Sequence, residues 1–174
     1  MEYISSDTNV WIDFMKIEIL NLPFKLQYVY LMENSTISEE LLVPEGLNAR
    51  LVELGLKGTD MSFEEYILAE EYGSKYKRLS NHDCIALAIA KNRKIILLTG
   101  DLNLRKAAKA EKVNIMGTLK ILDELIGGKL ISSAEYEDCL CKLSELNGGV
   151  VRLPQDEIDK RLKRKGDGRN DCIQ

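Results

Sequence analysis

Runs of strand length alternate along the chain with segments of helical period. Residues 3–5 form a short β-prone run, and residues 94–99 form a largely apolar run that leads into Gly100-Asp101. A continuous apolar run of this length is typical of a central parallel strand that is covered on both faces. Because helical segments separate the strands, the pattern predicts an α/β fold with a central parallel sheet and right-handed crossovers.

The pattern of apolar and polar residues also predicts the remaining strands and helices and the domain boundaries. Further strands are predicted at residues 26–31, 56–61 and 113–116. One or two short helices are predicted at residues 10–22, and further helices at residues 37–43, 45–54, 62–78, 84–94, 101–112, 119–126, 134–146 and 154–162. We expect one domain over residues 1–146, an extension over residues 147–163 that packs on it, and a flexible polar tail over residues 164–174.

Composition limits the functional classes. The 174 residues are enough for one domain with a sizeable core, and no apolar run approaches the roughly 20 residues of a membrane span. The start MEYISSD lacks the pattern of a signal peptide, so we expect a cytoplasmic protein. The four cysteines form no CxxC pair and there is one histidine, which argues for reduced thiols and against zinc. A net charge of −4 argues against a broad, sequence-independent nucleic-acid binder, but it does not exclude a nucleic-acid enzyme.

Four carboxylates are the candidate functional groups. Asp7 follows the first strand and Asp101 follows the apolar strand, so a parallel sheet would bring both to the edge where ligands bind. Asp83 lies in the first turn of the helix before the apolar strand, and Glu40 can reach the same edge from a short helix. Several acids at one rim would repel one another without a cation, and oxygen ligands alone select Mg²⁺ or Mn²⁺ over zinc.

Each of these acids also has a purely structural interpretation. Asp83 lies three residues after Ser80 and can complete a capping box. Asp7 and Asp101 can each be the N-cap of the helix that follows. Glu40 can be a solvated helix residue.

Other polar residues are assigned from their positions. His82 is expected at the surface or in a supporting role, because a lone histidine offers no ligand cluster. Asp13 and Asp123 lie inside or late in helices and are expected to be exposed. Arg105, on the helix behind Asp101, is the basic residue that we most expect near a phosphate, whereas the other basic clusters are typical of solvated faces.

Three blocks of the sequence resemble the PIN domain, namely SDTNVWIDF at residues 6–14, LSNHDCIALAIAK at 79–91 and LLTGDLNLRKAAKAEKVNIMGT at 97–118. The third block is the most specific. The chain looks most like the small prokaryotic PIN proteins of VapC type, the ribonuclease toxins of toxin–antitoxin pairs, in order over residues 3–126. The resemblance implies a three-layer α/β/α sandwich around a central parallel sheet, with extra C-terminal helices similar to the extension of one subgroup.

The resemblance also implies a site, a cofactor and partners. The catalytic and metal-binding residues would be Asp7, Glu40, Asp83 and Asp101, with Glu39 as an alternative to Glu40. Thr8 or Asn9, beside the first acid, and Thr99, before the last, would be supporting polar residues. Their positions on the helix behind Asp101, rather than the resemblance, add Asn103 as a supporting polar residue and Arg105 as a phosphate contact. The implied activity is Mg²⁺- or Mn²⁺-dependent hydrolysis of phosphodiester bonds in single-stranded RNA. A cognate antitoxin and a homodimer are the implied protein partners, and no membrane partner is expected.

Two other functional classes stay open. One is a metal-dependent phosphatase or phosphoacceptor that uses an Asp nucleophile. A haloacid-dehalogenase-like site needs a second Asp two residues after the first, where this chain has Asn9, and a receiver domain needs an acidic pair before its strand-end Asp. The other is a non-catalytic PIN-like module that binds nucleic acid or protein, which the presence of all four acids disfavours.

Overall fold

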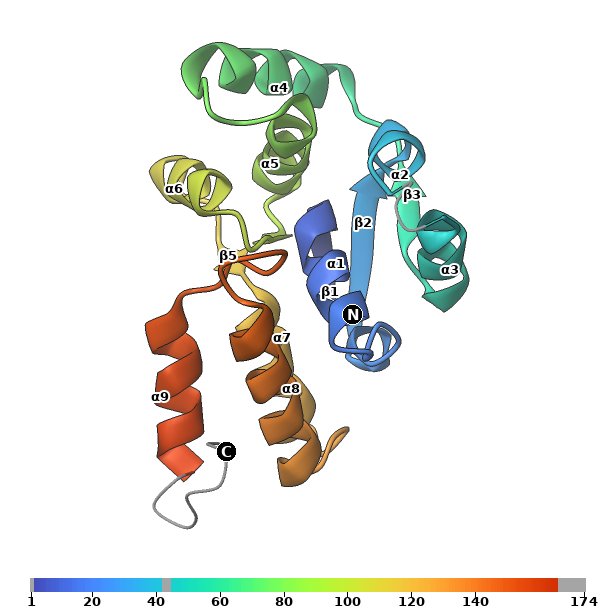
Figure 1. Cartoon of the computed structure of the whole chain (residues 1–174). Coiled ribbons are helices and arrows are strands. Elements are labelled where there is room, and N and C mark those ends of the chain that lie inside the picture. The colour runs from blue at the N-terminus through green and yellow to red at the C-terminus, as the bar shows by residue number, and fades with distance from the viewer. Residues whose placement is uncertain (1, 42–44, 166–174) are drawn as a thin grey trace.

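The strands form one parallel sheet, as the hydrophobic pattern predicts. The computed structural model describes residues 2–41 and 45–165, without the side chains of 164 and 165. Its sheet has five strands in the order β3-β2-β1-β4-β5, and every pairing is parallel (Figure 1). The strands are β1 (Glu2–Ser6), β2 (Tyr28–Glu33), β3 (Lys57–Thr59), β4 (Ile96–Leu98) and β5 (Ile115–Met116). The predicted α/β fold is confirmed.

Helices cover both faces of the sheet. Side chains alternate between the two faces along each strand, and here apolar side chains on both faces pack against helices. Leu98 of β4 packs with Ile4 of β1 in one hydrophobic cluster, whereas the neighbouring Leu97 packs in another. The first cluster contains residues of α1, α3, α7, α8 and α9, and the second contains residues of α4, α5 and α6. The result is the three-layer α/β/α sandwich that the resemblance implies (Figure 1).

The helices have the following bounds: α1 (Thr8–Lys16), α2 (Asn34–Glu39), α3 (Leu47–Leu54), α4 (Phe63–Lys75), α5 (Asn81–Arg93), α6 (Leu102–Ala110), α7 (Thr118–Gly127), α8 (Ser133–Leu146) and α9 (Gln155–Lys165), with a 3₁₀ turn, η1, at Pro23–Lys25. As predicted, α5 is buried through Ala90. None of the described helices is both long and apolar enough to cross a membrane.

The helix after β2 differs from the prediction. We predicted it at residues 37–43, from a capping box, but α2 spans Asn34–Glu39. The side chain of Glu33, at the end of β2, accepts hydrogen bonds from two backbone amides of the first turn and so fixes an earlier start. Glu39 is therefore the last residue of α2, and Glu40 is its C-cap.

The segment after α8 packs on the same hydrophobic core as β1. Val151 and Ile158 are fully buried in the cluster that contains Ile4. Helix α9 continues to Lys165, three residues beyond the predicted end at 162. Residues 166–174 of the expected tail and residues 42–44 lie outside the described residues.

Candidate functional site

Two of the predicted acids lie at the switch point of the sheet. β1 pairs with β2 on one side and with β4 on the other, so the strand order reverses between β1 and β4. In open α/β sheets, ligands bind at the carboxyl ends of strands at such a point. Asp7 follows β1 directly, and its amide donates to the carbonyl of Leu98 in β4 at 3.0 Å. Asp101 is three residues beyond Leu98, so both carboxylates leave the sheet at this edge.

The carboxylate of Asp7 is held in place by its neighbours. Its Oδ1 accepts a hydrogen bond from the amide of Thr8 at 2.7 Å, which makes Asp7 the N-cap of α1. Its Oδ2 accepts from the side-chain amide of Asn9 and from the hydroxyl of Thr99, both at 2.7 Å. The side chains of Asn9 and Thr99 therefore fix the orientation of Asp7, with Thr99 reaching it from β4.

The surroundings of Asp7 disfavour its charged form. Asp7 is 6% exposed, and burial is the main reason why its pKa rises from 3.8 to about 7. The negative charges of Asp83 and Glu40 raise this pKa further, while the hydrogen bonds from Thr99 and Thr8 oppose the rise. Carboxylates from three separate segments thus act on one another at this edge.

Thr99 connects Asp7 to Asp101. The Thr99 hydroxyl donates to Asp7 and accepts from the amide of Asp101 at 3.0 Å. Asp101 is the N-cap of α6, because its Oδ1 accepts from the amide of Leu104 at 2.8 Å. Asn9 makes a second connection, since its Oδ1 accepts from the amide of Gly100 at 3.0 Å. The loop that carries Asp101 is thereby tied to the start of α1.

Asp83 approaches from the N-terminal end of α5. It completes the capping box with Ser80, and its Oδ2 accepts from the Ser80 amide at 2.7 Å. Burial is the main reason why the pKa of Asp83 is raised; hydrogen bonds from Ser80 oppose the rise, and the charge of Asp101 adds to it. Asp83 therefore interacts electrostatically with both strand-end acids, because it also raises the pKa of Asp7.

The two glutamates at the end of α2 face different partners. Glu40 accepts a hydrogen bond at its Oε2 from the hydroxyl of Thr8 at 3.1 Å, which places it beside Asp7. The side chain of Glu39 is 63% exposed, and its Oε2 lies 3.4 Å from Nε2 of His82. His82 is also within 2.9 Å of the Thr36 hydroxyl through Nδ1, so it links α2 to α5 in a supporting position.

A comparison with protein families gives one match over nearly the whole chain. A family model described as a PIN domain matches residues 3–167. The chain belongs to the PIN domain family. Comparisons with curated proteins and with solved structures gave no significant match. PIN domains are generally nucleases, so membership indicates hydrolase chemistry on nucleic acid.

PIN nucleases typically use divalent metal ions, and the donor atoms at this edge suit such an ion. The four acids offer only carboxylate oxygens, the ligands of Mg²⁺ and Mn²⁺. Burial is the main reason why the pKa of Asp7 is raised, and the negative charges of Asp83 and Glu40, which a cation would neutralise, add to the rise. However, no three carboxylate, imidazole or thiol groups among the described residues are already arranged to hold an ion. The chemistry of the donor atoms therefore fits a divalent ion.

The structural interpretation of the acids also holds in this PIN domain. Asp7 and Asp101 are N-caps, and Asp83 completes a capping box. A carboxylate has about four lone-pair sites on two oxygens, so a capping hydrogen bond leaves acceptor capacity for another ligand. Capping therefore explains where each acid sits on its helix but not why acids from different segments gather at one edge.

Two acids were wrongly predicted to be exposed. Asp13 is 5% exposed, and its Oδ2 accepts from the hydroxyl of Thr118 at 2.6 Å. Burial raises the pKa of Asp13 to about 6, opposed by that hydrogen bond. Asp123 is partly buried and bonds to Arg161 of α9 at 2.8 Å and to the hydroxyl of Tyr136 at 2.6 Å. Both residues face helices distant in sequence, which the local pattern could not reveal.

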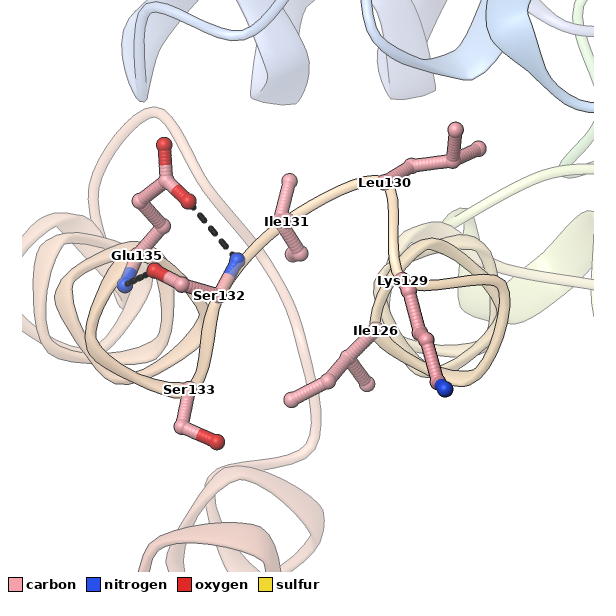
Figure 2. Close-up of a pocket in the computed structure, with 7 residues that line it drawn as sticks. All are labelled: Ile126, Lys129, Leu130, Ile131, Ser132, Ser133 and Glu135. Atoms are coloured by element: carbon pink, nitrogen blue, oxygen red, sulfur yellow. Dashed lines mark hydrogen bonds between the residues drawn. The ribbon is translucent and has the colours of Figure 1, made fainter.

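The loop before α8 lines a hollow in the surface, in which Ser132 and Glu135 are engaged in a helix cap. Figure 2 shows the amide of Ser132 donating to Glu135 and the amide of Glu135 donating to the Ser132 hydroxyl, at 2.7 and 3.2 Å. This hollow lies at the end of α7 opposite to Thr118, about 15 Å away for a ten-residue helix. It is therefore separate from the acidic edge.

Proposed function

We propose that this PIN domain is an Mg²⁺- or Mn²⁺-dependent endoribonuclease that hydrolyses phosphodiester bonds in single-stranded RNA. The observation that carries the proposal is the Asp7 carboxylate at the switch point, where burial and, after it, the charges of Asp83 and Glu40 raise its pKa. An excess of negative charge at a ligand-binding edge is the arrangement expected of a cation site. A flexible, unpaired strand can bring its backbone to such an edge more easily than a duplex can.

The residues at the acidic edge would have two roles, namely to hold the ion and to orient the carboxylates that hold it. Asp7, Glu40, Asp83 and Asp101 would hold the ion, which would stabilise the charge on the phosphoryl oxygens of the scissile phosphate. Asn9 and Thr99 orient the Asp7 carboxylate, and Thr8 orients Glu40. Burial raises the pKa of Asp7 to about 7, so the deprotonated carboxylate that would hold the ion is favoured above this pH.

The biological setting is proposed from the resemblance to VapC-type proteins. In this setting the protein is the toxin of a toxin–antitoxin pair, acts in the cytoplasm and is bound by a cognate antitoxin. A homodimer is the proposed oligomeric state. Sedimentation of the purified protein, alone and with the product of the adjacent gene, tests both partners.

A non-catalytic PIN module is the alternative. The capping roles of Asp7, Asp83 and Asp101 favour it, because each acid has a structural use even without an ion. Such a module would bind nucleic acid or protein and would not need a cation.

An RNA cleavage assay separates the two functions. Single-stranded RNA is incubated with the purified protein in Mg²⁺, in Mn²⁺ and in EDTA. The proposal expects cleavage in at least one metal and none in EDTA. An absence of cleavage in both metals, with weak or absent Mn²⁺ binding by calorimetry, would favour the non-catalytic module.

The two glutamates of α2 offer a matched pair of variants. We expect Glu40→Gln to lower metal-dependent cleavage at least about tenfold, because it removes a charge from the carboxylate cluster beside Asp7. Glu39→Gln removes the same charge one residue away, at an exposed side chain that faces His82, and is expected to stay within about twofold of wild type. Initial rates at saturating RNA make the comparison, and a larger loss in Glu39→Gln would reverse the assignment.

A further inference from the structure

A groove leads from the acidic edge to the segment after α8. It has a volume of about 1120 Å³ and is open to solvent. Its lining includes Asn9, Gly100 and Asp101 from the acidic edge, and residues 147–150 and 152–154 from the segment after α8. Figure 1 shows this turn, in red, beside β5. Asp101, one of the proposed catalytic residues, and the C-terminal extension thus line the same groove.

The turn that forms the outer wall is held in a defined conformation. The side chain of Asn147 donates to the carbonyl of Leu153 and accepts from its amide, both at 2.9 Å. The amide of Gly148 donates to the carbonyl of Val151 at 3.0 Å, and Gly148 has a φ of +85°, which favours glycine. Val151 is fully buried, so the exposed residues on either side of it, Val150 and Arg152, are held at the surface.

Two cations of the groove are available for an anionic ligand. Among the described residues, no carboxylate lies within 4.0 Å of the guanidinium of Arg105 or Arg152. Arg105 is fixed by a hydrogen bond from Nη1 to the carbonyl of Thr99 at 3.2 Å. A side chain at Gly117 would begin 2.9 Å from the same nitrogen, so glycine leaves the room that Arg105 occupies.

The other charges of the groove are already paired or lie at its catalytic end. Lys120 lies 3.5 Å from Glu124, and Arg161 is bonded to Asp123 and Glu157. The acids that remain are Asp13, which accepts a hydrogen bond from Thr118, and Asp101, which caps α6 at the acidic edge. The outer part of the groove is therefore locally basic, although the chain as a whole carries a net charge of −4.

We propose that this groove binds the segment of single-stranded RNA next to the scissile phosphate, with the guanidinium groups of Arg105 and Arg152 bonding to phosphates of the RNA backbone. Guanidinium groups suit phosphate because their donors match its oxygens. The exposed side chains of Leu102 and Val150, which line the same groove, offer apolar surface to the bases. The turn at residues 147–154 is then part of the substrate site. This inference rests on the proposed function, because it takes RNA as the substrate.

Binding of a labelled single-stranded RNA oligonucleotide in EDTA tests the groove without requiring cleavage. Arg152→Gln is expected to weaken binding about threefold to tenfold. It should also lower the slope of log K against log salt concentration by about 0.7, the value for one lost phosphate contact with a single strand. Arg152→Lys keeps the charge and should recover most of the affinity. Arg50→Gln removes the same charge from α3, outside the groove, and should change neither quantity.

The outcomes separate this proposal from the proposed function. Failure of wild-type protein to bind the oligonucleotide, or equal effects of Arg152→Gln and Arg50→Gln, would overturn the groove proposal even if cleavage is observed. A weaker affinity and a smaller salt slope in Arg152→Gln, with no change in Arg50→Gln, would support the groove proposal. This holds even if the protein cuts no RNA. In an active enzyme, Arg152→Gln is expected to raise KM more than it lowers kcat.

Discussion

Asp7→Asn and Asp101→Asn are each expected to lower metal-dependent RNA cleavage at least about 100-fold, because each removes a charged ligand from the proposed cation site. The fold should survive the change at Asp7. Asn can still cap α1 through its oxygen, but its NH2 group cannot accept the two hydrogen bonds that Asn9 and Thr99 donate to Oδ2 of Asp7. Removal of a buried charge, which Asp83 and Glu40 also repel, offsets this loss. The thermal midpoint in EDTA above pH 7 is therefore expected to stay within a few degrees of wild type.

A matched control exists on α8. Asp138→Asn makes the same chemical change at a side chain that is 61% exposed and paired with Lys142 one turn away. This variant should retain wild-type activity. Wild-type cleavage rates in a folded Asp7→Asn protein would contradict the assignment of the site, whatever the behaviour of the control.

Trp11→Ala is expected to destabilise the protein by about 3–5 kcal/mol, the usual cost of truncating a buried aromatic side chain. Trp11 is fully buried one turn after Asp7. Its ring stacks on Phe24 and meets the edge of Tyr30, each at 5.0 Å between centroids. Its Nε1 donates to the hydroxyl of Ser6 at 3.3 Å. The thermal midpoint should fall by about 10 °C, as measured by circular dichroism or calorimetry.

The control for Trp11 is another aromatic residue. Phe63 is 75% exposed at the start of α4, so Phe63→Ala should change the free energy of unfolding by less than about 0.5 kcal/mol. Similar effects of the two truncations would show that the cluster around Trp11 does not stabilise the fold as its burial indicates.

The fold and the positions of three acids were predictable from local sequence. The apolar run that contains β4 and the small apolar residues of α5 report burial directly, since each run has a length and period of its own. Asp7 and Asp101 follow strands of a parallel sheet, and that position alone brings them to one edge. Asp83 is positioned by the capping signal of Ser80, which is also local.

The glutamate of the acidic cluster was harder to predict than the three aspartates. Helix α2, which ends beside it, begins at a different residue from the predicted one. The capping pattern of Thr36 and Glu39 competes with Glu33, and the structure uses Glu33 as the cap. The choice between Glu39 and Glu40 then depends on which side chain faces Thr8 of α1, across 32 residues of sequence. No periodicity within α2 contains that information.

The sequence by itself determined the elements, the parallel sheet and the edge at which acids gather, because hydrophobic period and capping act over a few neighbouring residues. Only the tertiary structure decided that Asp13 is buried against Thr118, that Asp123 binds Arg161, and that Arg152 lines a groove beginning at Asp101. The hydrogen-bonded pairs are far apart in the sequence: Asp123 and Arg161 are separated by 38 residues, and Asp13 and Thr118 by 105 residues. These contacts depend on how the helices pack across the sheet. The local sequence around each of these residues is compatible with either an exposed or a buried side chain.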